Sequence, residues 1–228
     1  MPSKPDRLPT VPGVTTIGDD LLCVRSEDPA MAQHLAAHLR ATGPWREVVA
    51  GIDSVVVQFD NTALSAGTAA DAIATAVAAA PERGVIAAAA IEIPVCYDGD
   101  VGPDLLSVST GLGITPAEFI ERHTAREYRV DMLGFTPGFA YLGGLDERLN
   151  VPRLAAPRVR VEAGSVGIAG GRTGLYALPG PGGWPIIGRT PCRLFDAGAD
   201  EPFVLKPGMT VRFRAIDAAA FATDQSAP

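Results

Sequence analysis

The segment from Leu133 to Phe195 constrains the fold of this 228-residue chain most, because glycine and proline interrupt it at short intervals. It opens with GFTPGFAYLGG at residues 134–144, where glycines alternate with large apolar and aromatic side chains. Glycine admits backbone angles that a Cβ forbids, while proline fixes φ and lacks an N–H donor. Such a segment cannot form a long helix, so it predicts short strands joined by tight turns.

Two further segments of the same kind follow, AGSVGIAGGRTG at residues 163–174 and PGGWPIIGRTP at residues 181–191. We expect these three segments to form the walls of one site. Short strands are predicted between the turns at residues 159–161, 165–169, 174–178, 185–188, 193–195 and 210–214. Short strands at regular spacing are typical of a closed or nearly closed barrel.

The first half of the chain predicts a small α+β sandwich with its helices on one face of a sheet. Strands are expected at residues 21–24, 47–50, 54–59 and 87–95. One helix begins after the N-cap Asp28 and a second after Ser65, and a third begins after Thr115, three residues before a glutamate. The predicted organisation is a flexible leader (1–12), an α+β domain (13–95), a helical connector (96–127), an all-β barrel domain (128–217) and a mobile tail (218–228).

Composition excludes several classes of protein. Hydrophobic residues make up 47% of the chain and charged residues 20%, as in soluble globular proteins. A net charge of −7 argues against nucleic acid or an anionic membrane as the main partner. The apolar run at 85–95 is too short to cross a bilayer, and the N-terminus lacks the apolar core of a signal peptide. We therefore expect a cytoplasmic protein whose three cysteines, which show no CxxC spacing, are free thiols.

Several catalytic motifs are absent or misleading. Residues 183–190, GWPIIGRT, differ from a P-loop only by arginine in place of lysine, but Pro185 and Pro191 favour extended backbone. The chain has no GxSxG motif and no Rossmann glycine pattern. His34 and His38 have the spacing of metal ligands without an acidic or cysteine partner, so a solvated helix face is the favoured interpretation. No metal site is predicted.

The candidate catalytic residues are His123, Tyr128 and Arg172. His123 and Tyr128 flank the start of the first strand of the glycine-rich half, where they are suited to donate a proton or anchor a substrate. A helix cap is an equally good interpretation of His123. Arg172 and Arg189 each follow a glycine turn and are suited to clamp a carboxylate or phosphate bidentately.

The remaining candidates are expected to bind substrate. The backbone amides of Gly138, Gly170 and Gly171 are suited to bind an anion or a developing oxyanion. Two of the aromatic residues, Phe139 and Tyr141, fit a pocket as well as the core, whereas Phe135 and Trp184 fit the core better. The full set of predicted substrate-binding residues is Asp131, Phe135, Pro137, Gly138, Phe139, Tyr141, Gly170, Gly171, Thr173 and Arg189.

These motifs together resemble the hallmark segments of the allophanate hydrolase subunit 1 family. The matching segments are residues 133–146, 163–171, 181–184 and 187–196, supported by 93–97, 102–105 and 123–128, and they extend over roughly Val14 to Ala215. The family includes the B-type subunit of bacterial ATP-dependent 5-oxoprolinase and the KipI-type sporulation kinase inhibitors. Two positions depart from its pattern: Arg172 stands where glutamine is usual, and Gly180 where serine is usual.

The resemblance implies an α+β N-terminal domain followed by a cyclophilin-like barrel. It also implies a partner, the subunit-2 or C-type chain, with the active site in or near their shared cleft, and a further A-type subunit. With ATP as co-substrate, a 5-oxoprolinase complex opens a lactam to L-glutamate, because phosphorylating the carbonyl oxygen creates a leaving group.

Two other functions remain open at this point. If the family's other activity applied, the same complex would hydrolyse allophanate, another small amide. A different class is a regulator that docks on a sensor histidine kinase through its barrel. Prolyl isomerase activity is a weak third hypothesis, because a fold by itself does not confer a function.

Overall fold

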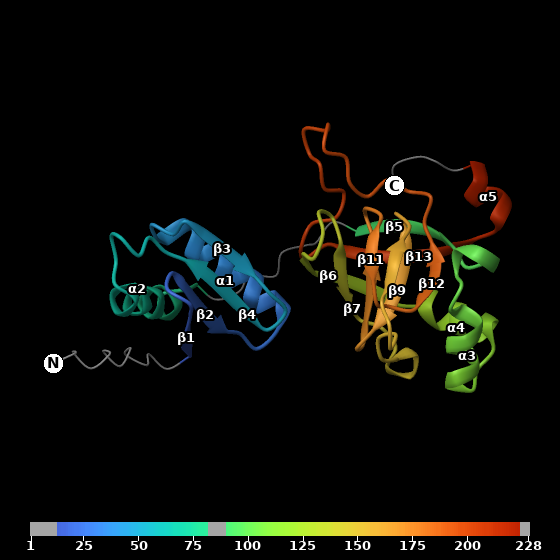
Figure 1. Ribbon diagram of the computed structural model, residues 1–228, viewed down its shortest axis with the longest axis horizontal. Helices are drawn as coiled ribbons and strands as arrows, with labels where there is room; N and C mark the ends of the chain where they lie inside the picture. Colours follow the sequence, from blue (N-terminus) through green and yellow to red (C-terminus); the bar gives the residue numbers. More distant parts are fainter. Residues whose placement is uncertain (1–12, 82–89, 224–228) are drawn as a thin grey trace. The chain divides into compact units, whose positions relative to one another are not determined.

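The computed structural model of the chain describes residues 13–81 and 90–223, which divide into two compact units between Ile86 and Ala87 (Figure 1). The predicted leader (1–12) lies outside the described residues, as do the last five residues of the predicted tail. Each unit has a hydrophobic core of its own. Within the described residues, no helix is long and apolar enough to cross a membrane.

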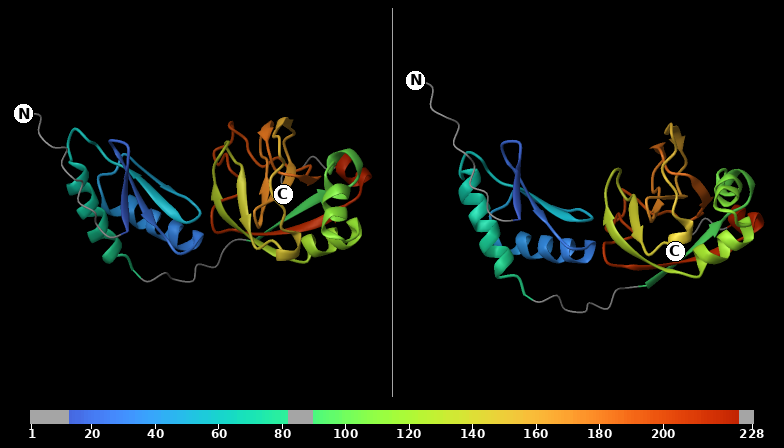
Figure 2. Two further views of the ribbon diagram at one scale, coloured as in Figure 1. Left: turned by 60° about the horizontal axis from the view of Figure 1, so that its bottom comes forward. Right: turned by 90° about the horizontal axis from the view of Figure 1, so that it is seen from below.

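The first unit is a four-stranded antiparallel sheet in the order β1-β2-β4-β3, with two helices on one face (Figure 2). Buried and more accessible side chains alternate along its strands. In β2, Leu22 and Val24 are buried while their neighbours in the strand are more accessible, which gives the helices one apolar face to cover. Asp28 and Ser65 accept hydrogen bonds from the first turns of α1 and α2, which confirms both predicted caps. The elements are β1 (Val14–Ile17), β2 (Leu21–Arg25), α1 (Pro29–Thr42), β3 (Glu47–Ala50), β4 (Ser54–Gln58) and α2 (Ala66–Ala78).

The second unit contains a closed seven-stranded barrel in the order β10-β7-β6-β13-β5-β12-β9, which confirms the predicted barrel. Its strands are β5 (Ala90–Cys96), β6 (Glu127–Leu133), β7 (Ala140–Gly143), β9 (Ser165–Ala169), β10 (Arg172–Leu175), β12 (Ile186–Arg189) and β13 (Thr210–Ile216). A separate two-stranded ribbon pairs β8 (Arg158–Val161) with β11 (Gly180–Gly182). The helical elements are η1 (Gly99–Val101), α3 (Leu105–Leu112), α4 (Pro116–Thr124), η2 (Glu147–Leu149) and α5 (Ala218–Thr223).

The boundary between the units differs from the prediction, which placed residues up to 95 in the first domain. Strand β5 pairs in parallel with β13, the last strand of the chain, with Ile93 opposite Phe213. The predicted connector 96–127 therefore lies within the second unit, where Phe119 of α4 is buried in the barrel core. Alternation in a sequence reveals a strand but does not identify its partner, and here the partner lies more than a hundred residues away.

Close packing of aromatic rings explains part of the glycine pattern. Gly174 of β10 lies beneath Phe139 and Trp184, and a Cβ there would come within 2.8 Å of the Phe139 ring and 2.9 Å of the Trp184 ring. Phe139 belongs to a small apolar cluster with Tyr176 and Ile186, distinct from the barrel core, and its ring lies edge-on to that of Trp184 at a centroid distance of 5.9 Å. The glycine removes the side chain that would otherwise hold the aromatic layer away from the strand.

The remaining local differences concern short strands. Residues 193–195 form no strand, and Phe195 makes only an isolated bridge to Phe203. Strands β1 and β11 were not predicted, and the helix α5 occupies part of the predicted tail. The P-loop-like residues 183–190 run into strand β12, as predicted from their prolines.

Candidate functional site

His123 lies in the core of the barrel unit, fully buried between aromatic rings. Its ring stacks on Phe213 at a centroid distance of 4.8 Å and also packs against Phe119 and Tyr128. Nδ1 lies 2.8 Å from the hydroxyl of Tyr97, and Nε2 lies 3.2 Å from Oγ1 of Thr173. Both ring nitrogens therefore have a hydroxyl partner inside the protein.

The surroundings of His123 hold the imidazole neutral. Burial lowers its pKa to about 3, since an imidazolium would lose its hydration there. Burial also raises the pKa of Tyr128, whose hydroxyl donates a 2.8 Å hydrogen bond to the His123 carbonyl. Thr173 is fully buried as well. The predicted site residues His123, Tyr128 and Thr173 therefore lie in the core and not at the surface. The fourth member of this group, Tyr97, was not among the predicted site residues, although it ends the segment 93–97 that resembles the family.

The outer face of the same strands carries a different arrangement, in which Asp131 and Arg172 form an ion pair. Nε of Arg172 lies 3.3 Å from Oδ2 of Asp131, with the two side chains 29% and 10% exposed. Asp131 sits at an irregularity in β6 opposite β7, and Arg172 begins β10 on the other side of β7. The pair therefore spans the strand between them.

Gly143 makes this crossing possible. A Cβ at Gly143 would lie 2.7 Å from Oδ2 of Asp131, so the carboxylate occupies the space of the missing side chain. Residues two apart on a strand share a face, which places Tyr141 on the same side of β7 as Gly143. Burial raises the pKa of the Tyr141 hydroxyl, while the charge of Arg153 opposes that shift. Asp131, Tyr141, Gly143 and Arg172 thus form a polar surface, which we call the outer polar face.

The backbone amides beside the outer polar face are already used. The N–H of Gly170 donates to the Val151 carbonyl at 3.0 Å, and the N–H of Gly171 donates to Oδ1 of Asn150 at 2.7 Å. The prediction of free anion-binding amides at Gly170 and Gly171 is therefore wrong. Both glycines instead supply the positive φ angles of the turn that leads to Arg172.

The two predicted arginine clamps do not share a hollow. Arg172 pairs with Ala169 and Arg189 pairs with Ser165, at opposite ends of β9. A strand rises about 3.3 Å per residue, so roughly 13 Å separates these positions along β9. Nε of Arg189 instead donates to the Ala163 carbonyl at 2.7 Å, and its guanidinium lies over the Phe221 ring.

Phe135, Pro137 and Gly138 also lie away from the outer polar face. They form the turn before Ala140, which pairs with Leu175, whereas Arg172 lies at the other end of β10. Phe139 is buried in the aromatic cluster, while Phe135 is 62% exposed, contrary to its predicted core position. The predicted single site thus divides into a core group, an outer polar face and a separate turn, with Phe139 in the aromatic cluster and Arg189 at the other end of β9.

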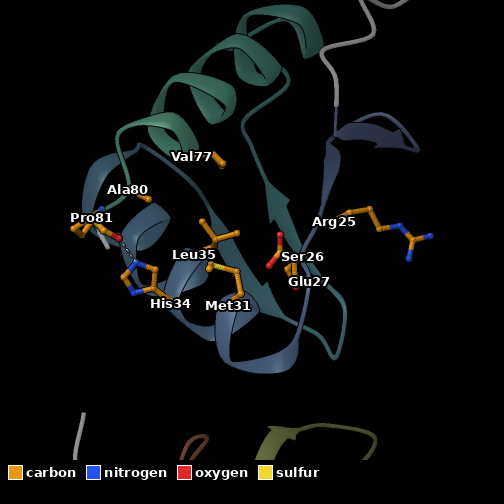
Figure 3. Close-up of a pocket in the computed structure, with 9 residues that line it drawn as sticks. All are labelled: Arg25, Ser26, Glu27, Met31, His34, Leu35, Val77, Ala80 and Pro81. Atoms are coloured by element: carbon orange, nitrogen blue, oxygen red, sulfur yellow. Dashed lines mark hydrogen bonds between the residues drawn. The ribbon is translucent and has the colours of Figure 1, made fainter. Parts of the chain in front are cut away.

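The first unit contains a cavity of about 640 Å³ between α1 and α2 (Figure 3). Its walls include Met31, Leu35 and Val77, and Nε2 of His34 at its edge lies 2.8 Å from the Pro81 carbonyl. The cavity contains none of the predicted site residues. Among the described residues, no cluster of histidine, cysteine and acidic side chains is suited to hold a metal ion.

Curated proteins similar to the chain are named for one enzyme. The chain is 54% identical over 123 residues to the B-type subunit of 5-oxoprolinase from Escherichia coli O157:H7, a match covering 54% of this chain and 56% of that protein. It is 50% identical over 123 residues to the corresponding 5-oxoprolinase subunit from Bacillus subtilis, covering 54% and 51%. The chain thus spans about half the length of the curated relatives it matches.

Solved structures extend the similarity over most of the chain. A conserved uncharacterized protein, PH0987, from Pyrococcus horikoshii is 41% identical, with 91% of this chain and 99% of that chain covered and a TM-score of 0.57. The urea amidolyase of K. lactis is 17% identical with a TM-score of 0.77, covering 92% of this chain and 15% of that one, which shows a common fold.

The family model described as "Carboxyltransferase domain, subdomain C and D" matches residues 13–205, most of the chain. This match extends over most of both units, ending before β13, and it includes the outer polar face and the turn at Phe135. Together with the curated relatives, it establishes the family that the motifs at 133–146 and 163–171 resembled. The chain belongs to the carboxyltransferase subdomain C and D family, in the group that contains allophanate hydrolase subunit 1 and the B-type subunit of 5-oxoprolinase.

Proposed function

We propose that this chain is the B-type subunit of a 5-oxoprolinase complex, which opens 5-oxoproline to L-glutamate with hydrolysis of ATP and needs its C-type and A-type partner chains. The observation that carries the proposal is the 50–54% identity to three curated 5-oxoprolinase subunits of this type. We also propose that the barrel is of the cyclophilin-like type, as the family resemblance implies.

The outer polar face supports a substrate-binding role. 5-Oxoproline carries a carboxylate and a neutral lactam. In the described part of the chain, Arg172 uses Nε toward Asp131, which leaves its two terminal nitrogens to bind a carboxylate. Asp131 fixes the plane of the guanidinium, and the Tyr141 hydroxyl stays protonated as a hydrogen-bond donor.

The buried position of His123 supports the dependence on a partner. A general base must come within hydrogen-bond reach of the proton that it removes, and His123 uses both nitrogens inside the core. The accessible groups of the outer polar face are suited to hold a substrate. We therefore assign the groups that cleave the lactam to a partner chain.

The described residues do not form a nucleotide site of the P-loop kind. The segment 183–190 leads into strand β12, where a P-loop leads into a helix whose amides hold phosphates. No step on this chain is therefore assigned to ATP, and we propose that a partner chain holds the nucleotide.

The test is to combine the chain with its A-type and C-type subunits and measure 5-oxoproline-dependent ATP hydrolysis and glutamate release. Arg172→Met is expected to raise KM for 5-oxoproline about tenfold or more with a small change in kcat, because uniform binding is lost. Arg160→Met is the matched control, since Arg160 also pairs with an acidic residue but lies on the ribbon.

Three results would contradict the proposal. No turnover of 5-oxoproline by the assembled complex would remove it, and turnover of allophanate alone would replace it with the family's other reaction. Binding of the lone chain to a sensor histidine kinase, without assembly, would favour a KipI-type regulator.

A further inference from the structure

An exposed loop carries Arg153 beside the outer polar face. The N–H of Gly170, in the turn that precedes β10, donates to the Val151 carbonyl at 3.0 Å. The N–H of Leu154 donates to the Gly183 carbonyl at 2.8 Å, at the start of the segment that leads into β12. Arg153 lies between these two bonded positions, so its backbone is held at both ends.

The Arg153 guanidinium lies near the hydroxyl of Tyr141. Burial raises the pKa of the Tyr141 and Tyr176 hydroxyls, and the positive charge of Arg153 opposes both shifts. Tyr176 is buried, whereas Tyr141 is half-buried, so Tyr141 presents the accessible hydroxyl of the two. Its ring is held edge-on against Phe139 and Trp184, at centroid distances of 4.7 Å and 5.8 Å. Packing therefore fixes the direction of the Tyr141 hydroxyl.

Both groups have hydrogen-bonding capacity that the protein leaves unused. Within residues 13–81 and 90–223, no hydrogen bond or ion pair engages the Arg153 side chain or the Tyr141 hydroxyl. Arg172, by contrast, is partly engaged by Asp131. A guanidinium only donates hydrogen bonds, and a protonated tyrosine hydroxyl can donate one, so together they fit an acceptor oxygen.

The spacing between these donors and Arg172 fits a small substrate. Gly174 pairs with Tyr141, and Arg172 stands two residues before Gly174 on β10. Two residues span about 7 Å along a strand. 5-Oxoproline carries its carboxylate and its lactam carbonyl on the two ring carbons that flank the nitrogen. One molecule therefore presents an acceptor group to each end of the outer polar face.

We propose that Arg153 and the Tyr141 hydroxyl bind the lactam carbonyl oxygen of 5-oxoproline while Arg172 holds its carboxylate. This inference rests on the proposed function and adds the residue that recognises the lactam. Arg153 orients the substrate, and the groups that cleave the ring still come from a partner chain. Such a site discriminates against analogues that lack the carbonyl oxygen, because its donors then lose their partner.

The test uses two analogues that each carry half of the substrate's polar groups, measured as competitive inhibitors of 5-oxoproline turnover by the assembled complex. 2-Pyrrolidinone has the lactam without the carboxylate, and cyclopentanecarboxylate has the carboxylate without the lactam. We expect Arg153→Met to raise the Ki of 2-pyrrolidinone about tenfold and to change the Ki of cyclopentanecarboxylate by less than about twofold. Arg172→Met should give the opposite pattern.

Two further variants sharpen the comparison. Tyr141→Phe keeps the packed ring and removes only the hydroxyl, so it should raise the Ki of 2-pyrrolidinone about fivefold. Arg148→Met is the matched control, because the Arg148 guanidinium is exposed and pairs with none of the described residues, but Arg148 lies on η2. This control should leave both Ki values unchanged.

The remaining outcomes overturn the inference. An unchanged Ki of 2-pyrrolidinone in both Arg153→Met and Tyr141→Phe would remove it while turnover of 5-oxoproline by the wild-type complex retains the proposed function. A rise only in the Ki of cyclopentanecarboxylate would assign Arg153 to the carboxylate instead. If 2-pyrrolidinone does not inhibit, an unchanged KM for 5-oxoproline in Arg153→Met overturns the inference, and a KM raised about tenfold supports it. A wild-type complex that does not consume 5-oxoproline would remove both proposals.

Discussion

Arg172 and Thr173 are neighbours in β10, yet they belong to regions with opposite properties. Thr173 points into the barrel, where it contacts the neutral, fully buried His123. Arg172 points outward, where it keeps an ion pair with Asp131 and retains access to solvent. Strand alternation thus separates a core group from the outer polar face within one peptide bond. Polar residues close in sequence need not serve one site.

Replacing His123 should give the largest effect on stability. His123→Ala would remove a ring packed between Phe213 and Phe119 and leave the hydroxyls of Tyr97 and Thr173 without their partner. We expect a loss of about 3 kcal/mol in the free energy of unfolding, measured with urea. A variant that stays stable but loses substrate turnover would mean that His123 acts in catalysis after all.

Acid should weaken the core through the same residue. The pKa of His123 is about 3 in the folded chain and about 6.5 when unfolded, so between these values the unfolded state binds the extra proton. The stabilisation is complete above pH 6.5 and is lost as pH falls, by up to about 1.4 kcal/mol per pH unit. Urea unfolding at several pH values should show this slope, and His123→Asn should reduce it. An equal slope in His123→Asn would exclude this histidine as its source, while His34→Gln serves as the surface control.

A methyl group at Gly143 should disturb the outer polar face without touching the core. Gly143→Ala would place a Cβ 2.7 Å from Oδ2 of Asp131 and displace the carboxylate from Arg172. We expect a loss of about 1–2 kcal/mol in stability and a higher KM in the assembled complex. Gly180→Ala is the matched control, because a Cβ there meets nothing within 4 Å. Equal behaviour of the two variants would show that the crossing at Gly143 is unimportant.

Removing the charge of Arg172 should change stability least. Partly exposed ion pairs contribute about 1 kcal/mol or less, so Arg172→Met should shift the free energy of unfolding by no more than that. The same variant is expected to affect substrate binding strongly, which separates binding from folding. A large loss of stability in urea would instead assign Arg172 a structural role.

Local features were predictable because their causes are local. The caps at Asp28, Ser65 and Thr115 depend on a side chain three residues from the N–H that it binds, and all three formed. Pro185 and Pro191 excluded a P-loop because proline favours extended backbone at and just before its own position, which is also a local effect. Motif similarity also identified the family, since it compares patterns rather than packing.

The candidate site was less predictable because it depends on register. The residues around Arg172 and Arg189 in the sequence do not reveal that these arginines pair at opposite ends of β9. Those around Gly143 do not reveal that the Asp131 carboxylate fills the space of the missing side chain. The turn at Phe135 was hidden for another reason. Phe135 has positive φ, which phenylalanine rarely adopts, so the sequence favoured a core position.

The sequence by itself determined the glycine-interrupted β-structure of the second half, the helix starts and the family, because these follow from backbone freedom, capping and pattern. Only the tertiary structure decided that β5 joins β13 in the barrel, that His123 is buried and that Asp131 reaches Arg172. These contacts join residues far apart in the chain, and their geometry follows from strand register and packing, which no local segment encodes.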